Sequence, residues 1–341
     1  MAITRFGIGM GRHLTTKDVG AHAAAAEEHG FEHLTILDDI TLTRDVYVML
    51  TLAALATSKI QIGHGVTHPR IRHAAQTAAA TASLHEVSDG RAFLGIGAGA
   101  LYSLVGEPNG RIAETRETIL ASRHLARGEA FELANGTKIH SPWMKDPFPI
   151  YVAAEGPRGL QLAGELGDAV WTLGFHPVLR EWRFDHLKRG AAQADRSLDD
   201  VDVWLRTMVV MADSKEEGRD IARPYCATIA HQFALGVLNR DNEHTRRLKE
   251  LMPDDLLDDY ARARSAWDYY QHETYRAEHA KAVSDAIVDT NVIVGTPEHC
   301  AEMITEIIDM GFDGISMTVY LHEDKIKFFR EFAADVMPLL A

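Results

Sequence analysis

The chain of 341 residues has very few cysteines and no long hydrophobic run. Its two cysteines, Cys226 and Cys300, lie far apart in the sequence, which excludes a framework of disulfides and favours a reducing compartment. No apolar stretch approaches the roughly 20 residues of a membrane-spanning helix, so we expect no membrane partner. The first residues, MAITRFGIGMG, also lack the charged-then-apolar layout of a secretory signal. We therefore expect a cytoplasmic protein.

Basic residues are also scarce. Lys and Arg total 35 against 49 Asp and Glu, which gives a formal net charge of −14. Nucleic acids and anionic membrane surfaces require a basic face, so this balance argues against both as partners. Hydrophobic residues make up 46% of the chain and charged residues 25%, which is ordinary for a soluble globular enzyme.

Several common catalytic motifs are missing as well. The sequence has no Walker A lysine motif, no H-E-x-x-H and no C-x-x-C. The run GIGAG resembles part of a dinucleotide fingerprint, but counted from Gly97 the third glycine of G-x-G-x-x-G would fall at Tyr102. His64 and His68 are four residues apart on a strand end rather than on a helix. We therefore expect ordinary pocket or capping histidines there and no metal site.

A strand–helix–strand unit over residues 59–100 is the most informative stretch that is present. Its first strand alternates apolar residues, and Gly63 and Gly65 interrupt it in the manner of a bulge or a close backbone approach. An alanine-rich helix is expected over 72–84, followed at 92–96 by an apolar strand of the buried, parallel type. In folds built from such units, ligands bind at the carboxyl ends of the strands.

Strand and helix patterns alternate along the whole chain. Strands are expected at residues 3–10, 33–37, 59–66, 92–96, 149–154, 168–173, 201–211 and 314–319. This alternation predicts a (β/α)8 TIM barrel, whose ordinary length of about 250 residues leaves a surplus here. We assign the surplus to a hairpin at 131–140, signalled by an Asn-Gly turn, and to a charged helical insertion at about 215–290. The insertion precedes the last strand–helix units, and all of 1–341 is expected to form a single domain.

The carboxyl ends of the strands carry the candidate site residues, because barrel active sites are built on that face. Asp38 and Asp39 follow the second strand, where a like-charge pair could raise one pKa and provide an acid or base. Alternatively, Asp38 only fixes backbone N–H groups of the loop. Residues 154–158 join a strand to a helix, and the free N–H groups there can bind a phosphate. A plain tight turn is the other interpretation of that segment.

Four stretches together resemble the bacterial luciferase-like superfamily: ILDDITLTRDVYVMLTLAALAT, IQIGHGVTHP, SDGRAFLGIGAG and PIYVAAEGPRGLQLAGELGDAVW. In order and spacing they are most similar to its coenzyme F420-dependent branch, typified by methylenetetrahydromethanopterin reductase. The similarity runs over residues 5–171 and resumes at 295–319. It implies a (β/α)8 barrel that binds F420, a deazaflavin that passes a hydride at C5 without activating oxygen.

The resemblance also implies roles for particular residues. The family has a non-prolyl cis peptide bond in its strand-three bulge, behind the cofactor ring, and the matching bond here joins Gly65 and Val66. The ring and tail contacts of the family correspond to Asp38, Gly65, Val66, Thr67, Gly97 and Ala98. Its phosphate-binding turn corresponds to Ala154, Glu155 and Gly156.

The chain departs from the reductase-like pattern at several positions. It has Asp38-Asp39 where that pattern has Asp-His, and His68 where the pattern has Asn. It also has Ala100 and Gly9 where the pattern has, or often has, an acid. The usual proton-handling groups are thus missing or moved, and the substrate of the relatives is not implied. Asp39, His64 and His68 are the candidate proton donors.

We therefore expect an F420-dependent oxidoreductase that transfers a hydride between the deazaflavin C5 and a small organic substrate. An FMN-dependent monooxygenase that uses reduced flavin and oxygen is one alternative. A non-catalytic cofactor-binding protein, suggested by the lost acidic residues, is the other. Relatives are commonly dimers, and the second and third helices could form such an interface, so a homodimer is expected.

Overall fold

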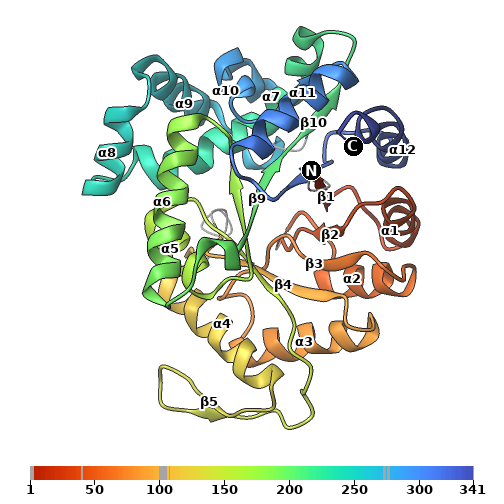
Figure 1. The fold of residues 1–341 in the computed structure, drawn as a ribbon, viewed down its shortest axis with the longest axis vertical. Coiled ribbons are helices and arrows are strands. Elements are labelled where there is room, and N and C mark those ends of the chain that lie inside the picture. The colour runs from red at the N-terminus through yellow and green to blue at the C-terminus, as the bar shows by residue number, and fades with distance from the viewer. Residues whose placement is uncertain are drawn as a thin grey trace.

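The structure is a computed structural model that describes residues 4–39, 41–99, 106, 108–271, 274 and 277–340. Eight parallel strands close into a barrel in the order β1-β12-β9-β8-β7-β4-β3-β2. They are β1 (Arg5–Met10), β2 (His33–Ile36), β3 (Gln61–His64), β4 (Ala92–Gly97), β7 (Ile150–Ala153), β8 (Ala169–Leu173), β9 (Asp202–Thr207) and β12 (Gly314–Thr318). The expected (β/α)8 barrel is confirmed, with helices packed around the strands (Figure 1).

Several of the outer helices begin where a side chain satisfies the first free N–H groups. Asp45 accepts hydrogen bonds from the backbone N–H groups of Tyr47 and Val48 at 3.0 and 3.2 Å, and so caps the second helix. The helices around the barrel are α1 (Val19–Glu28), α2 (Val46–Leu55), α3 (Ala74–Val87), α4 (Ile112–Ala126), α5 (Pro157–Leu166), α6 (Pro177–Gln193), α11 (Pro297–Asp309) and α12 (Lys325–Asp335). Short 3-10 helices follow α6 and α12 as η2 (Leu198–Asp200) and η6 (Met337–Leu340). The expected hairpin is present as antiparallel β5 (Phe131–Glu132) and β6 (Lys138–Ile139).

The seventh expected strand, 201–211, is divided in the structure. Its first part is the barrel strand β9, whereas β10 (Val209–Met211) pairs in parallel with β11 (Ile293–Gly295) in a separate two-stranded sheet. The division occurs at Thr207, whose hydroxyl donates to the carbonyl of Asn291 at 2.7 Å. The expectation of one continuous strand is therefore wrong, because the chain leaves the barrel to pair with a strand that the sequence did not indicate.

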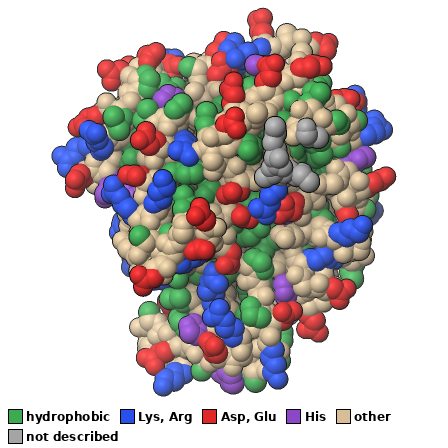
Figure 2. All heavy atoms as spheres, viewed as in Figure 1, with side chains coloured by type: hydrophobic (Ala, Val, Ile, Leu, Met, Phe, Trp, Pro, Cys, Tyr) green, Lys and Arg blue, Asp and Glu red, His purple; other side chains and the backbone are tan. Residues whose placement is uncertain are grey.

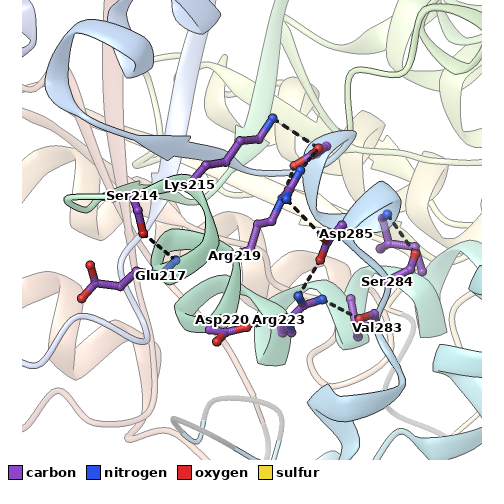
Figure 3. Close-up of polar contacts among 11 residues, drawn as sticks. Ser214, Lys215, Glu217, Arg219, Asp220, Arg223, Val283, Ser284 and Asp285 are labelled. Atoms are coloured by element: carbon purple, nitrogen blue, oxygen red, sulfur yellow. Dashed lines mark hydrogen bonds and ion pairs between the residues drawn. The ribbon is translucent and has the colours of Figure 1, made fainter.

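The insertion between β10 and β11 is helical, as expected. It contains α7 (Lys215–Phe233), a π-helical turn η3 (Ala234–Leu238), α8 (Glu243–Leu251), α9 (Asp254–Ala266), the 3-10 helices η4 (Tyr269–Gln271) and η5 (Glu278–Ala282), and α10 (Asp285–Asp289). Ion pairs connect its first and last helices (Figure 3). Arg219 of α7 donates to Asp289 at 2.9 Å and to Asp285 at 3.0 Å, and Arg223 donates to the carbonyl of Val283 at 2.7 Å. These contacts close the insertion on itself.

Aromatic side chains fill the barrel interior near the amino ends of the strands. We call the opposite opening, at the carboxyl ends of the strands, the mouth. Phe93, Tyr151, Trp171 and Trp204 form one buried cluster, and the ring of His33 lies 4.5 Å from that of Trp204. Glycines on other strands make room for these rings: a Cβ atom at position 63 would collide with Phe93, one at 314 with Trp204, and one at 7 with His33. This packing closes the barrel below its carboxyl ends, so a ligand can enter only from the mouth.

None of the helices in the described part of the chain combines the length and apolar character that crossing a bilayer needs.

Candidate active site

The ends of β3 and β4 meet at the expected bulge. The peptide bond between Gly65 and Val66 is cis, as the family resemblance implied. Beyond it, the Thr67 N–H donates to the carbonyl of Gly95 at 2.8 Å, and the Gly97 N–H donates to the carbonyl of Thr67 at 3.1 Å. These bonds continue the pairing of the two strands past the bulge and fix its backbone at the mouth of the barrel.

The surface around the bulge is formed by small residues. A Cβ atom at Gly97 would lie 3.1 Å from the Val66 side chain and 3.4 Å from the carbonyl of Ala153. Val66 and Ala153 in turn rest on the aromatic cluster in the barrel. Ala98 follows Gly97 and its carbonyl accepts from the N–H of Gly110 at 2.7 Å. Val66, Gly97 and Ala98, which we call the cradle, thus form a surface of small residues at the strand ends, with Val66 and Ala98 partly exposed, and this surface suits a flat ring.

Asp38 connects the β2 loop to this bulge. Its side chain is buried, accepts a hydrogen bond from the Thr67 hydroxyl at 2.6 Å and forms an ion pair with Arg72. Arg72 also lies over the ring of Tyr47, with its guanidinium carbon 4.9 Å from the ring centroid. Sequence reasoning did not identify Arg72. These contacts are with a hydroxyl and a guanidinium rather than with the backbone N–H groups expected for Asp38, and through them its carboxylate joins the loop after β2 to the bulge.

Asp39 is directed to the insertion rather than to the bulge. It accepts from the backbone N–H groups of Thr41 and Leu42 at 2.9 and 3.0 Å, which orders its own loop. The hydroxyl of Tyr269 lies 2.8 and 2.9 Å from its two carboxylate oxygens and donates to them. Burial raises the pKa of Tyr269, so this hydroxyl remains a donor at neutral pH. The contact between Tyr269 and Asp39 arises because the insertion folds over the mouth.

His64 lies on the outer side of the barrel wall. Gly63 and Gly65 face the interior, so the alternation of β3 directs His64 to the helices, where its ring is 4.8 Å from that of Tyr47. The side chain is fully buried, and burial lowers its pKa to about 4. A histidine in this position has no direct path to a ligand in the barrel mouth.

His68 connects two loops by hydrogen bonds to backbone atoms. The N–H groups of Arg70 and Gly110 approach its Nδ1 and Nε2 at 3.1 and 3.0 Å. Burial lowers the pKa of His68 to about 4, while a hydrogen bond with the backbone of Ala98 opposes the change. The ring is therefore neutral at pH 7 and orders the chain on both sides of the bulge.

The segment after β7 presents backbone rather than side chains. Glu155 accepts from the N–H of Leu173 at 2.7 Å and pairs with the buried Arg183, so its carboxylate is directed into the protein. Burial raises the pKa of Glu155, and the charge of Arg183 opposes that rise. Gly156 precedes α5, and a Cβ atom there would meet no atom within 4 Å. The space and the free N–H groups at this turn are compatible with a phosphate.

Residues 1–314 match the family model described as luciferase-like monooxygenase. The chain belongs to this luciferase-like family. Ala100, one of the departures from the reductase-like pattern, lies outside the described residues.

Named relatives of this luciferase-like chain include enzymes of the F420-dependent branch. The 5,10-methylenetetrahydromethanopterin reductase of Archaeoglobus fulgidus is 30% identical, and the match covers 98% of this chain and 99% of the relative. The F420-dependent glucose-6-phosphate dehydrogenase of Beutenbergia cavernae is 25% identical over 95% of this chain and 93% of its own. The structure of the coenzyme F420-dependent tetrahydromethanopterin reductase of Methanopyrus kandleri has a TM-score of 0.81 at 23% identity, over the whole of both chains. At that identity the structural likeness shows the shared fold.

Proposed function

We propose that the protein is an oxidoreductase that uses coenzyme F420 and transfers a hydride between the deazaflavin and a small organic substrate. The observation that carries the proposal is the cradle of small residues at Val66, Gly97 and Ala98, placed at the mouth by the Gly65–Val66 backbone. The named F420-dependent relatives, which match nearly the whole chain, support the same cofactor.

Different residues at the mouth are assigned to the ring and to the tail of this cofactor. Gly65, Val66 and Thr67 provide a fixed backbone surface behind the ring, and Gly97 with Ala98 leaves space beside it. Ala154, Glu155 and Gly156 provide the turn for a phosphate of the tail, and the N–H groups at Glu155 and Gly156 can donate to it, because the N–H of Ala154 already donates to the carbonyl of Trp171 at 3.2 Å. When bound, the deazaflavin accepts or donates the hydride at C5.

Asp39 is the best placed of the three candidate proton donors. His64 faces the outer helices, and the side chains of both His64 and His68 are buried, at 0% and 1% exposed. Asp39 lies at the end of β2 and its carboxylate is partly exposed. We propose that Asp39, positioned by Tyr269, handles any proton that accompanies hydride transfer.

The cofactor is tested by titrating the purified protein with F420 and with FMN and following fluorescence. The proposal predicts saturable binding of F420, and oxidation or reduction of the bound F420 when a substrate is supplied. The description of the matched family favours one competitor, an FMN-dependent monooxygenase. Tight FMN binding without an F420 response would establish that competitor, and F420 binding with no turnover of any substrate would indicate a non-catalytic carrier.

We further propose a single domain that forms a homodimer in the cytoplasm. One continuous hydrophobic core includes side chains from both the barrel and the insertion, which supports a single domain. Apolar side chains on α2 and α3 are exposed, namely Val48 by 51%, Leu55 by 70% and Val87 by 45%, and could form the dimer interface. Acidic and basic side chains are interspersed on the face shown in Figure 2, which suits a small-molecule substrate better than a nucleic acid.

A further inference from the structure

Arg206 points into the barrel from β9 and has no carboxylate partner in the described part of the chain. The strand alternates Trp204 and Arg206 on its inner face, so Arg206 lies one layer above the aromatic cluster. Its guanidinium carbon is 5.7 Å from the centroid of the Trp171 ring. Among the described residues it donates a hydrogen bond to the hydroxyl of Tyr320 at 3.3 Å and forms no salt bridge. A cation inside a barrel is normally paired, so this arrangement needs an explanation.

The space around Arg206 is kept open by glycines and other small residues. A Cβ atom at Gly9 would lie 2.7 Å from its Nη2, and one at Gly65 would lie 3.1 Å from its Nη1. Gly9 pairs with Thr35 on one side and Thr318 on the other, so the neighbouring strands also contribute small side chains. The absence of a side chain at Gly9 is therefore what allows the guanidinium to occupy the centre of the mouth.

The guanidinium faces the mouth rather than the closed end of the barrel. Arg206 is partly exposed, whereas Trp171 and Trp204 directly below it are at most 2% exposed. Water, and hence a ligand, can reach it only from the carboxyl ends of the strands. Gly65, which follows β3 and lies beside it, also begins the backbone proposed to lie behind the cofactor ring.

Two tyrosine hydroxyls accompany the cation. Tyr320 follows β12 and is its hydrogen-bond partner. Tyr225 of α7 is buried, and its hydroxyl has no hydrogen-bond partner of normal geometry among the described residues. Burial raises the pKa of Tyr225, and an interaction with the Thr318 hydroxyl and the charge of Arg206 oppose that rise. A guanidinium that has no carboxylate partner among the described residues, together with a neighbouring hydroxyl, is a set of donors suited to a carboxylate.

We propose that Arg206 and the Tyr320 hydroxyl bind an anionic oxygen of the ligand in the barrel mouth, and that the substrate is a small carboxylic acid. This proposal rests on the proposed function, because it assigns the anion to the substrate of the hydride transfer. The same donors could instead bind an oxygen of the deazaflavin ring, which has the same chemistry from a different source. In either case Arg206 is a binding residue that the family resemblance did not supply.

The first test uses the protein without cofactor, so it does not depend on F420. Benzoate and benzamide have nearly the same flat shape and differ in charge, and their affinities are compared by calorimetry. We expect benzoate to bind more tightly by about tenfold, the equivalent of about 1.4 kcal/mol. Arg206→Gln should remove this preference, and Arg189→Gln should keep it, because Arg189 is an exposed side chain of α6 that loses the same charge. An equal affinity for the two probes, or a preference that survives in R206Q, would overturn the proposal.

A second variant tests the site with Arg206 still present. In Gly9→Asp the added Cβ atom would lie 2.7 Å from Nη2, so the guanidinium has to shift, and the new carboxylate beside it can pair with it; the benzoate preference should again disappear. Thermal melts of both variants establish that they are folded. If G9D kept the full preference for benzoate, the anion would be binding elsewhere.

The source of the anionic oxygen is decided by F420 titrations of the wild type and R206Q. If the substrate provides it, both proteins bind F420 with equal affinity, and benzoate binds to the wild-type F420 complex. If the ring provides it, R206Q weakens F420 by roughly the factor seen for benzoate, and the two ligands compete. If the wild type binds no F420 at all, the proposed function fails while the benzoate result for Arg206 stands on its own.

Discussion

The mouth of the barrel has two sides that are built in different ways. On the bulge side, formed by residues 64–68 and 96–98, contacts join neighbouring strands and the Asp38–Arg72 pair is buried beside them. On the insertion side, Asp39 and Thr41 meet Tyr269, which is more than 200 residues away in the sequence. Arg12 reaches the same segment, donating to the carbonyl of Tyr270 at 3.1 Å. The bulge side is thus a rigid part of the barrel, whereas the insertion side is held by a few hydrogen bonds.

This difference separates two functions that one mouth has to combine. A cofactor that is used in every turnover benefits from a surface that does not move, and the bulge side provides one through its backbone. Substrates differ among related enzymes, and the insertion side can change with a few side chains without disturbing the barrel. The difference predicts that substitutions on the bulge side cost more than substitutions on the insertion side.

The largest effect on stability is expected for Asp38→Asn. The variant keeps an oxygen for the Thr67 hydroxyl but leaves the largely buried Arg72 without its closest counter-charge. Breaking a buried pair in this way should lower the free energy of unfolding by about 3 kcal/mol, measured by urea denaturation. Asp185→Asn is the matched control, because Asp185 pairs with Arg189 on the exposed face of α6 and should cost less than about 1 kcal/mol. Equal costs for the two variants would mean that the pair does not hold the bulge side together.

The next effect concerns the cradle itself. In Gly97→Val the new side chain would press on Val66 and occupy the space proposed for the ring. We expect F420 affinity to fall on the order of 100-fold, the equivalent of about 2.7 kcal/mol, in a fluorescence titration. Gly236→Ala is the control, because a Cβ atom at Gly236 meets nothing within 4 Å. Unchanged F420 binding by folded G97V would place the ring elsewhere in the barrel.

The effect of His64 depends on pH. Burial lowers the pKa of His64 to about 4, so below pH 6.5 the unfolded chain binds a proton at this position that the folded chain does not. Stability is therefore lost as pH falls from about 6.5 to about 4, and at pH 5 the loss from this residue is about 2 kcal/mol. His64→Leu should reduce the difference in unfolding free energy between pH 7 and pH 5 by that amount, and leave the difference between pH 8 and pH 7 unchanged. The same pH dependence in wild type and variant would contradict this assignment.

The sequence predicted the bulge side well because its signals are local. Glycines in an apolar strand, a proline after it and the next strand's glycines all lie within residues 59–100, so their arrangement follows from strand pairing alone. The direction of His64 could also have been inferred, since strand alternation places it opposite Gly63 and Gly65. The prediction of a catalytic role for His64 rested on its place at the strand end and not on that alternation.

The insertion side could not be predicted in the same way. Tyr269 and Asp39 carry no shared pattern, and their contact exists only because the insertion folds back over the mouth. Arg206 is similar: its strand reads as an ordinary apolar run, and the space for its guanidinium depends on Gly9, on a strand nearly 200 residues earlier. Contacts of this kind depend on three-dimensional packing, which local sequence propensities do not report.

The smallest effect is expected from removing the Tyr269 hydroxyl, which is also the most direct test of the insertion side. Tyr269→Phe keeps the ring and removes the hydroxyl that donates to Asp39 and lies 2.9 Å from the Thr41 hydroxyl, so the free energy of unfolding should fall by about 1 kcal/mol. Tyr270→Phe is the matched control, because Tyr270 is 65% exposed and should show no measurable change.

The effect of Tyr269→Phe on local amide exchange should be larger than its effect on the free energy of unfolding. Asp39 accepts from the N–H groups of Thr41 and Leu42, so loosening its carboxylate should speed hydrogen exchange at these two amides. A Y269F variant that lost as much stability as D38N would show that the insertion is as integral to the mouth as the barrel strands are, and the proposed division between the two sides would be wrong.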